Sequence, residues 1–258
     1  MTEDVDLGSR FLRFERRGPV AWVTIDRPER RNALTSNMYF GIRRAVDRVN
    51  ASRTIHALVI TGTGDVFAPG GEMGGQHDDG PVNYGELVGN GVVPFDAIRD
   101  SRKPVIASVN GLCMGGGLLI TMLSDIAIAS DRAVFGAPEL LRGVADAYHA
   151  AILPEHVGIA IARDMLFTAR RLDASEAERH GLVARVVPHD QLTTATDEVV
   201  RDILRAAPRA RVALKRLVNA RYGSVDKITF DESVSGDEVI EGFRAFVEKR
   251  DPAWIPTD

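Results

Sequence analysis

The stretch KPVIASVNGLCMGGGLLITMLSD, residues 103–125, places three consecutive glycines where a buried strand turns into a buried helix. Residues 105–109 are small or β-branched, which suits a covered strand, and residues 118–123 are apolar on every side. The glycines at 115–117 carry no Cβ atom, so a ligand can approach their amides at the positive end of the helix dipole. This stretch predicts either a site for developing negative charge or only tight packing of a strand against a helix.

The composition is that of a folded protein of one large domain, or of one domain with a helical appendage. The chain has 258 residues, of which 45% are apolar and 26% charged, and this excludes disorder. The net charge of -4 and the short basic runs argue against nucleic acid as the main partner. The single cysteine, Cys113, excludes an internal disulfide and a cysteine-based zinc site, and it is typical of a reducing compartment.

Neither end of the chain resembles a membrane or secretion signal. The first residues, MTEDVDLGSRF, are acidic and contain no apolar core of a signal peptide. No uncharged run approaches the roughly 20 residues that span a bilayer. We therefore expect a soluble cytoplasmic protein with no membrane partner.

Strands alternate with helices over the first 187 residues. Residues 11–15 and 20–25 predict an opening hairpin, and the pair Thr35 and Ser36 can cap a helix that runs to about residue 50. This alternation predicts a parallel sheet with crossover connections, and its irregular spacing favours a spiral over an even barrel. The further strands are expected at 57–61, 105–109, 126–129, 134–135 and 183–187, and the further helices at 84–99, 146–155, 159–168 and 173–181.

The pattern changes after Pro188. Residues 193–207, 208–222 and 226–249 all read as amphipathic helices with no strand between them. We therefore divide the chain into an α/β core over residues 1–188 and a helical region over residues 189–258. The apolar faces of these helices predict a homo-oligomer.

Two glycine-rich loops at strand ends point to one kind of chemistry. The loop GTGDVFAPGGEMGG, residues 62–75, matches neither G-x-G-x-x-G nor a P-loop, so no nucleotide site of either type is supported. Its amides near Gly70 and Gly71, with those near residues 115–117, can form an oxyanion hole that stabilises a thioester enolate. Glu139, after Pro138 at a strand end, is the candidate for moving a proton at carbon.

Five ordered motifs along nearly the whole chain resemble the crotonase superfamily, which is the enoyl-CoA hydratase/isomerase family. The resemblance implies a crotonase-like spiral of β-β-α units, a C-terminal helical region that forms trimers, and a coenzyme A thioester as substrate rather than as a separate cofactor. The motifs are RPERRNAL at 27–34, VFAPGGEM at 66–73, KPVIASVNGLCMGGG at 103–117, FGAPE at 135–139 and EGFRAFVEKRDPAW at 241–254.

The resemblance also assigns roles to single residues. Gly71 and Gly116 correspond to the two oxyanion-hole donors, and Glu139 corresponds to the second of two hydratase glutamates. The first of those glutamates falls at Leu119, which has no proton to exchange, so hydration by two carboxylates is in doubt. The remaining positions that the resemblance places at the thioester or its coenzyme A are Arg31, Ala33, Ala68, Pro69, Gly70, Phe246 and Lys249.

A second acid can come from the segment that opens the helix after Gly143. Asp146 is either a catalytic acid or a plain N-cap, since Asp is a preferred residue there. His149 is either an acid/base partner or a packed imidazole. The other histidines lack the spacing of metal ligands, so we expect no metal site.

These observations favour isomerisation of an enoyl-CoA double bond, or weak hydration, with Glu139 as the only acid/base. One alternative is carbon-carbon or thioester hydrolysis by Asp146 and His149. Another is a protein that binds coenzyme A thioesters without turnover. The sequence predicts a trimer or a hexamer without distinguishing the two.

Overall fold

The computed structural model describes residues 5–72, 79, 94–220, 222, 225 and 227–255. The strands are β1 (Leu12–Arg17), β2 (Val20–Ile25), β3 (Ala57–Gly62), β4 (Val66–Ala68), β5 (Val105–Val109), β6 (Leu112–Met114), β7 (Ile126–Ser130), β8 (Val134–Gly136), β9 (Leu172–Asp173) and β10 (Arg185–Val187). The α-helices are α1 (Ser36–Ala51), α3 (Pro94–Asp100), α4 (Gly116–Leu123), α5 (Ala147–Val157), α6 (Ile159–Thr168), α7 (Ala174–Arg179), α8 (Leu192–Arg205), α9 (Pro208–Asn219), α10 (Lys227–Val234) and α11 (Asp237–Glu248). Short 3-10 helices are η1 (Pro28–Arg30), η2 (Glu139–Arg142) and η3 (His189–Gln191).

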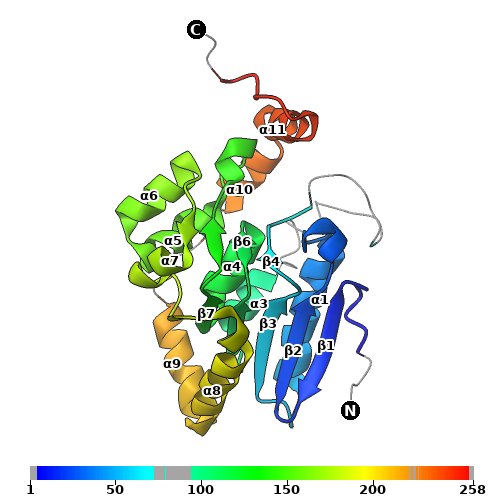
Figure 1. Ribbon diagram of the computed structural model, residues 1–258, viewed down its shortest axis with the longest axis vertical. Coiled ribbons are helices and arrows are strands. Elements are labelled where there is room, and N and C mark those ends of the chain that lie inside the picture. The colour runs from blue at the N-terminus through cyan, green and yellow to red at the C-terminus, as the bar shows by residue number, and fades with distance from the viewer. Residues whose placement is uncertain are drawn as a thin grey trace.

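The strands form two sheets, and the chain passes repeatedly from one sheet to the other. The larger sheet has the order β1-β2-β3-β5-β7-β10, and the smaller one has the order β4-β6-β8-β9. The pairs β3 and β4, β5 and β6, and β7 and β8 each send their first strand into the larger sheet and their second into the smaller one. Helices follow these pairs, so the chain winds as a spiral of β-β-α units (Figure 1). The predicted spiral is confirmed.

Successive side chains of a strand point to opposite faces of the larger sheet, and the two faces belong to two different hydrophobic cores. In β2, Val23 and Ile25 pack into the main core with α1 and α4, whereas Trp22 packs into a second core against α8. This is the period of two expected of strands covered on both faces. The first face therefore carries the main core, and α8 covers the second.

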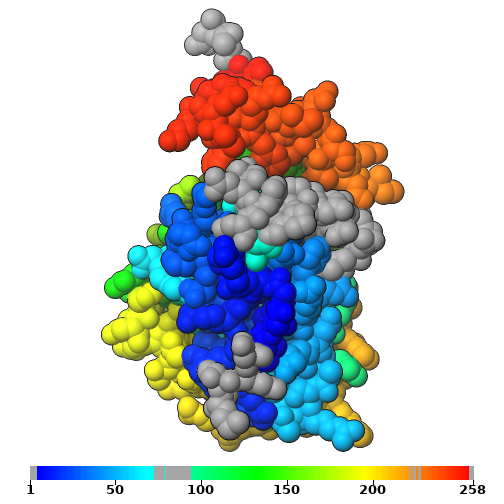
Figure 2. All heavy atoms as spheres, turned by 90° about the vertical axis from the view of Figure 1, so that its right-hand side faces the viewer, coloured from blue at the N-terminus to red at the C-terminus, as the bar shows by residue number. Residues whose placement is uncertain are grey.

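The C-terminal helices lie at opposite ends of the molecule. Helices α8 and α9 lie along the lower part in Figure 1, while α10 lies against the upper part of the α/β body and α11 lies above it. Figure 2 shows the last two helices, in orange and red, as a cap on one end of the body. In the described ranges no helix is both long enough and apolar enough to cross a bilayer.

Several expectations about the elements are confirmed. The hairpin of β1 and β2 pairs antiparallel, and α1 begins after Thr35, whose hydroxyl accepts from the Met38 amide. Asp173 and Glu176 form the expected capping box of α7. In each case the signal is local, because a cap or a tight turn uses residues that are close in sequence.

Two expectations are wrong. The helix expected at 226–249 is two helices, since α10 ends before Gly236, which caps α11. The strand ending at Val109 does not turn directly into a helix, because β6 intervenes and pairs with β4 and β8. Glu139 follows Pro138 after the end of β8, where it begins the 3-10 helix η2. The expected helix at 84–99 lies outside the described residues up to 93, and α3 covers its end.

Candidate functional site

A single β-bridge to Leu34 fixes the orientation of the Gly71 amide. The Leu34 amide donates to the Gly70 carbonyl at 2.9 Å, and the Glu72 amide donates to the Leu34 carbonyl at 2.9 Å. In a trans peptide unit the C=O of one residue and the N–H of the next point in opposite directions. The C=O of Gly70 points toward Leu34. The N–H of Gly71 therefore points away from Leu34, where it is available to a ligand.

The amide of Gly116 is left open by the start of α4. Gly116 is the first residue of that helix, so its N–H has no acceptor within the helix. Gly115 precedes it with φ of 53°, a conformation that favours glycine, and its own amide donates to the Gly136 carbonyl at 3.1 Å. The positive end of the helix dipole lies behind the Gly116 amide.

The two loops approach each other closely, and Glu139 lies beside them. A methyl group added at Gly70 would be 3.7 Å from the Gly116 amide nitrogen. One added at Gly115 would be only 2.4 Å from the Glu139 Oε1 atom. The structure thus brings Gly70, Gly115, Gly116 and the Glu139 carboxylate together, as the sequence predicts.

Asp146 and His149 join Glu139 from the first turn of α5. Asp146 caps that helix by accepting from the His149 amide at 3.0 Å, and its Oδ2 atom lies 3.1 Å from the His149 Nδ1 atom. The same Nδ1 atom lies 4.0 Å from Glu139 Oε2. Asp146 is therefore both the N-cap and a partner of the imidazole, and Glu139 is not an isolated carboxylate.

Burial and charge act in opposite directions in this cluster. Burial raises the pKa of Glu139 above its ordinary value. Burial would lower the pKa of His149, which is fully buried, but the negative charges of Asp146 and Glu139 raise it to about 9. Burial would raise the pKa of Asp146, but the His149 charge and hydrogen bonds lower it. The cluster therefore favours an imidazolium ion between carboxyl groups.

Glu139, Asp146 and His149 also offer the donor atoms of a divalent metal site. Their ligand atoms lie within 4.8 Å of one another. A metal needs the neutral imidazole, however, and the raised pKa of His149 favours the protonated ring. A metal ion would therefore have to displace the proton of His149.

The sequence of the chain matches the model of a known family over residues 15–256, described as enoyl-CoA hydratase/isomerase. The chain belongs to the enoyl-CoA hydratase/isomerase family. It is 33% identical to a carnitinyl-CoA dehydratase of Citrobacter koseri, over 95% of this chain and 98% of that protein. It is 35% identical to a mevalonyl-coenzyme A hydratase of Aspergillus fumigatus, over 91% of each chain.

Solved structures of the same family share the fold. An enoyl-CoA hydratase/isomerase from Pseudoalteromonas atlantica T6c aligns with a TM-score of 0.82 and 30% identity, covering 95% of this chain and all of that one. A carnitinyl-CoA hydratase from Mycobacterium avium aligns with a TM-score of 0.80 and 31% identity, covering 95% of this chain and 98% of that one. The crotonase-like fold and the family's enzymatic character are thereby established.

Other positions that the family resemblance singled out line the same region or its edge. Leu119 is buried one turn into α4, three residues beyond Gly116. Ala68 is buried in β4, and a methyl group at Gly117 would lie 2.4 Å from its carbonyl oxygen. Pro69 is half-buried at the start of the turn to Gly70.

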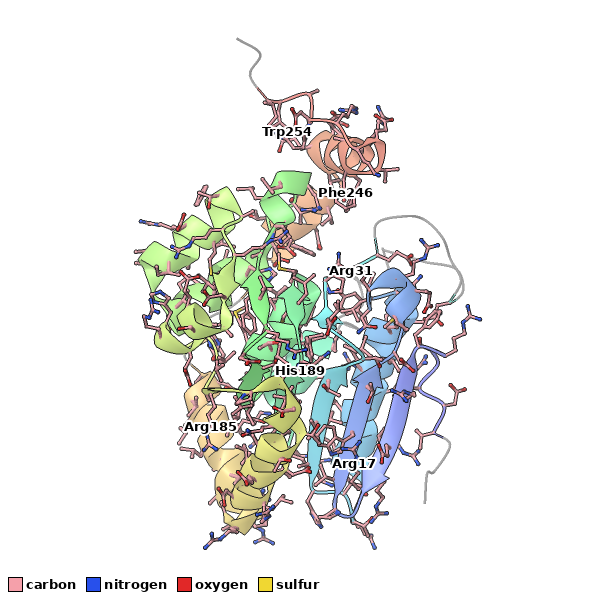
Figure 3. The ribbon with its side chains drawn as sticks, viewed as in Figure 1. Arg17, Arg31, Arg185, His189, Phe246 and Trp254 are labelled. Carbon is pink, nitrogen blue, oxygen red and sulfur yellow. The ribbon has the colours of Figure 1, made fainter. Side chains whose placement is uncertain are left out.

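Arg31, Ala33, Phe246 and Lys249 lie at the periphery. Arg31 and Lys249 are exposed and adopt left-handed backbone conformations after η1 and α11. The Ala33 carbonyl accepts from the Arg27 side chain, and the Arg142 guanidinium stacks on Phe246 at 4.7 Å. In Figure 3 Arg31 lies near the turn before α1, and Phe246 lies between α11 and the body. Their contacts with coenzyme A stay predictions.

The C-terminal cap packs on the turn between Glu139 and Asp146. The Ala145 amide donates to the Ser233 hydroxyl at 2.6 Å, and Ser233 in turn donates to the Gly143 carbonyl at 3.3 Å. A methyl group at Gly242 of α11 would lie 2.5 Å from the Arg142 backbone. Helices α10 and α11 therefore help to hold η2 and the start of α5.

Sequence reasoning missed a buried ion pair that supports the Gly71 loop. Arg27 has a fully buried side chain, and its guanidinium pairs with Glu72 at 2.9 Å. Phe11 packs against that guanidinium at 4.9 Å from the ring centre. The arginine lies 45 positions before Glu72, so no local pattern joins the two.

Replacing Glu72 by Ala should destabilise the fold strongly. The change leaves the Arg27 charge buried without its carboxylate, and breaking a buried pair in this way costs about 3–5 kcal/mol. Urea unfolding followed by circular dichroism measures the loss. The matched control is Glu15→Ala, because Glu15 pairs with Arg17 on the surface and its loss should change stability little. Equal effects of both substitutions would contradict the structural role of Glu72.

Proposed function

We propose that this protein adds water reversibly to the double bond of an enoyl-CoA thioester. The observation that carries the proposal is the convergence of Glu139, His149 and Asp146 beside the open amide of Gly116. Hydration needs a group that takes a proton from water and a proton for C2. It also needs stabilisation of the charge that develops on the thioester oxygen.

Glu139 is the group that exchanges protons with substrate, because its carboxylate lies directly beside Gly115, where an added methyl group would be 2.4 Å from Oε1. It takes a proton from water as the oxygen bonds to C3, and it returns that proton to C2 of the enolate. The amides of Gly71 and Gly116 donate hydrogen bonds to the enolate oxygen between these two proton transfers. His149 and Asp146, behind Glu139, keep a positive charge next to its carboxylate.

A second candidate is isomerisation of the double bond. It is favoured by Leu119, which leaves no second glutamate to orient a water molecule. Here Glu139 takes a proton from one carbon of a 3-enoyl thioester and returns it to another. Deprotonation of the 3-enoyl thioester gives a dienolate, whereas addition of water to the 2-enoyl thioester gives the enolate of a 3-hydroxyacyl thioester. The same two amides can hold the thioester oxygen in both.

One set of assays separates the candidates. Purified protein is given trans-2-enoyl-CoA and trans-3-enoyl-CoA in parallel, and the products are separated by chromatography. A 3-hydroxyacyl-CoA from the 2-enoyl substrate supports hydration, whereas conversion of the 3-enoyl to the 2-enoyl thioester supports isomerisation. Release of free coenzyme A supports hydrolysis, and binding without turnover supports a non-catalytic role.

The pH dependence of activity should be bell-shaped. Activity should rise as Glu139 loses its proton, above the ordinary range for a glutamate, and fall as His149 loses its proton near pH 9. Asp146→Asn keeps a capping side chain but removes the charge that holds the proton on His149. That variant should lose less activity than a Glu139 variant, and its upper limb should move to lower pH. Identical upper limbs in kcat/KM profiles would contradict the role of the pair.

We further propose that the protein forms a homo-oligomer through its C-terminal helices. On α11, Ile240, Phe246 and Val247 expose 55%, 49% and 61% of their surface, which is high for large apolar side chains. Light scattering at micromolar concentration should give a trimer or hexamer, and Val247→Glu should shift it toward monomer. The control is Arg244→Glu at an exposed polar position of the same helix. A monodisperse wild-type monomer would remove the proposal.

A further inference from the structure

The side chain of Tyr39 reaches the two glycines whose amides we propose as oxyanion donors. A methyl group added at Gly116 would lie 2.0 Å from the Tyr39 hydroxyl oxygen. One added at Gly71 would lie 3.8 Å from the same oxygen. The hydroxyl therefore lies between the Gly71 loop and the start of α4, although Tyr39 belongs to neither.

The position of this hydroxyl is set by the same turn that aims Gly71. Leu34 pairs with Gly71, Thr35 then caps α1, and the Tyr39 amide donates to the Thr35 carbonyl at 3.1 Å. The Tyr39 ring is mostly buried and packs edge-on against Phe95, with ring centres 5.9 Å apart. The ring is thus held by a helix and an aromatic contact, while its hydroxyl group and the adjoining ring edge lie against Gly116.

We propose that the Tyr39 hydroxyl is a third hydrogen-bond donor to the thioester oxygen, beside the amides of Gly71 and Gly116. The proposal rests on the proposed function, because the charge it stabilises is that of the enolate. A phenol can donate one hydrogen bond, and a donor fixed in place before the reaction needs no reorganisation when the negative charge develops. No bond to Tyr39 is made or broken.

A role limited to packing makes a different prediction. The aromatic contact with Phe95 uses the ring alone, so a phenylalanine at position 39 would retain it. The proposed bond to the thioester oxygen requires the hydroxyl group. Tyr39→Phe therefore removes that group and keeps the ring without opening a cavity.

The first test compares the kinetics of Tyr39→Phe with those of the wild type on the enoyl-CoA substrate that the protein turns over. The value of kcat should fall by about 10- to 10³-fold, as for loss of an oxyanion donor, while KM changes little. The matched control is Tyr148→Phe, from the same aromatic group. Tyr148 packs on Phe95 with ring centres 5.4 Å apart, but its hydroxyl bonds to Asp96. A Tyr39→Phe enzyme whose kcat is within twofold of the wild type would overturn the proposal.

The second test does not depend on turnover. The infrared carbonyl stretch of a carbon-13-labelled saturated acyl-CoA, bound to each protein, reports the hydrogen bonds on the thioester oxygen. It should lie at higher frequency in Tyr39→Phe than in the wild type and in Tyr148→Phe. An unchanged frequency would overturn the proposal even if kcat falls. If the wild type turns over no enoyl-CoA but this shift is present, the proposed reaction fails and the role of Tyr39 stands. If no acyl-CoA binds, both fail.

Discussion

Glu139→Gln should lower turnover by about 10²–10⁴-fold with little change in KM, because it removes the group that moves the proton. The substitution keeps the size of the side chain and its place at the start of η2, so the shape of the site is retained. It also keeps the close approach to Gly115, where a methyl group would lie 2.4 Å from the carboxylate. Steady-state kinetics with the enoyl-CoA substrate, together with calorimetric binding of a saturated acyl-CoA, measure the two effects separately.

The control for this experiment is Glu198→Gln, on the exposed side of α8. That helix packs on the face of the larger sheet that lies away from the site, so the control should retain wild-type activity. If Glu139→Gln is as active as Glu198→Gln, proton transfer does not depend on Glu139. His149 would then be the group to replace next.

Gly71→Pro should lower kcat by about 10²–10³-fold, because proline has no N–H to donate to the thioester oxygen. The position has room for a β carbon: its φ is not left-handed, and among the described residues an added methyl group would meet only the Tyr39 hydroxyl, at 3.8 Å. A collision of the β carbon is therefore not expected to cause the loss. Gly116 is less suitable, since any side chain there would collide with Tyr39.

Gly71→Ala is the matched control, because it adds the same Cβ atom and keeps the amide. It should retain most of the activity, and circular dichroism should show both variants folded. A folded Gly71→Pro enzyme with normal kcat would exclude this amide from the oxyanion hole. A large loss in Gly71→Ala as well would show that space, not the amide, limits the position.

Most of the local architecture could be predicted from sequence because its causes are local. The apolar faces of α1, the cap at Thr35 and the capping box of Asp173 and Glu176 each depend on residues within a few positions of one another. The short strands β4 and β6 were missed for a related reason. Three residues in a glycine-rich stretch carry too little periodicity, and they become strands only because β6 pairs with both β4 and β8.

The candidate site was predicted in part. The glycines and Glu139 could be identified because five motifs in order resemble one family, and the structure brings them together. The relation of Asp146 to His149 was left open, since a capping carboxylate and a catalytic one look alike in sequence. The distance of 3.1 Å between Asp146 and the imidazole shows that the capping residue is also the partner of His149.

The sequence by itself determined the α/β class, the family and the two loops that present the amides of Gly71 and Gly116. Only the tertiary structure decided that Glu139 lies beside His149, that Arg27 is buried against Glu72, and that the Tyr39 side chain reaches Gly71 and Gly116. Those contacts join residues 10 to 77 positions apart, on different elements. No periodicity or cap encodes such a contact, because it depends on how the sheets and helices pack once the whole chain has folded.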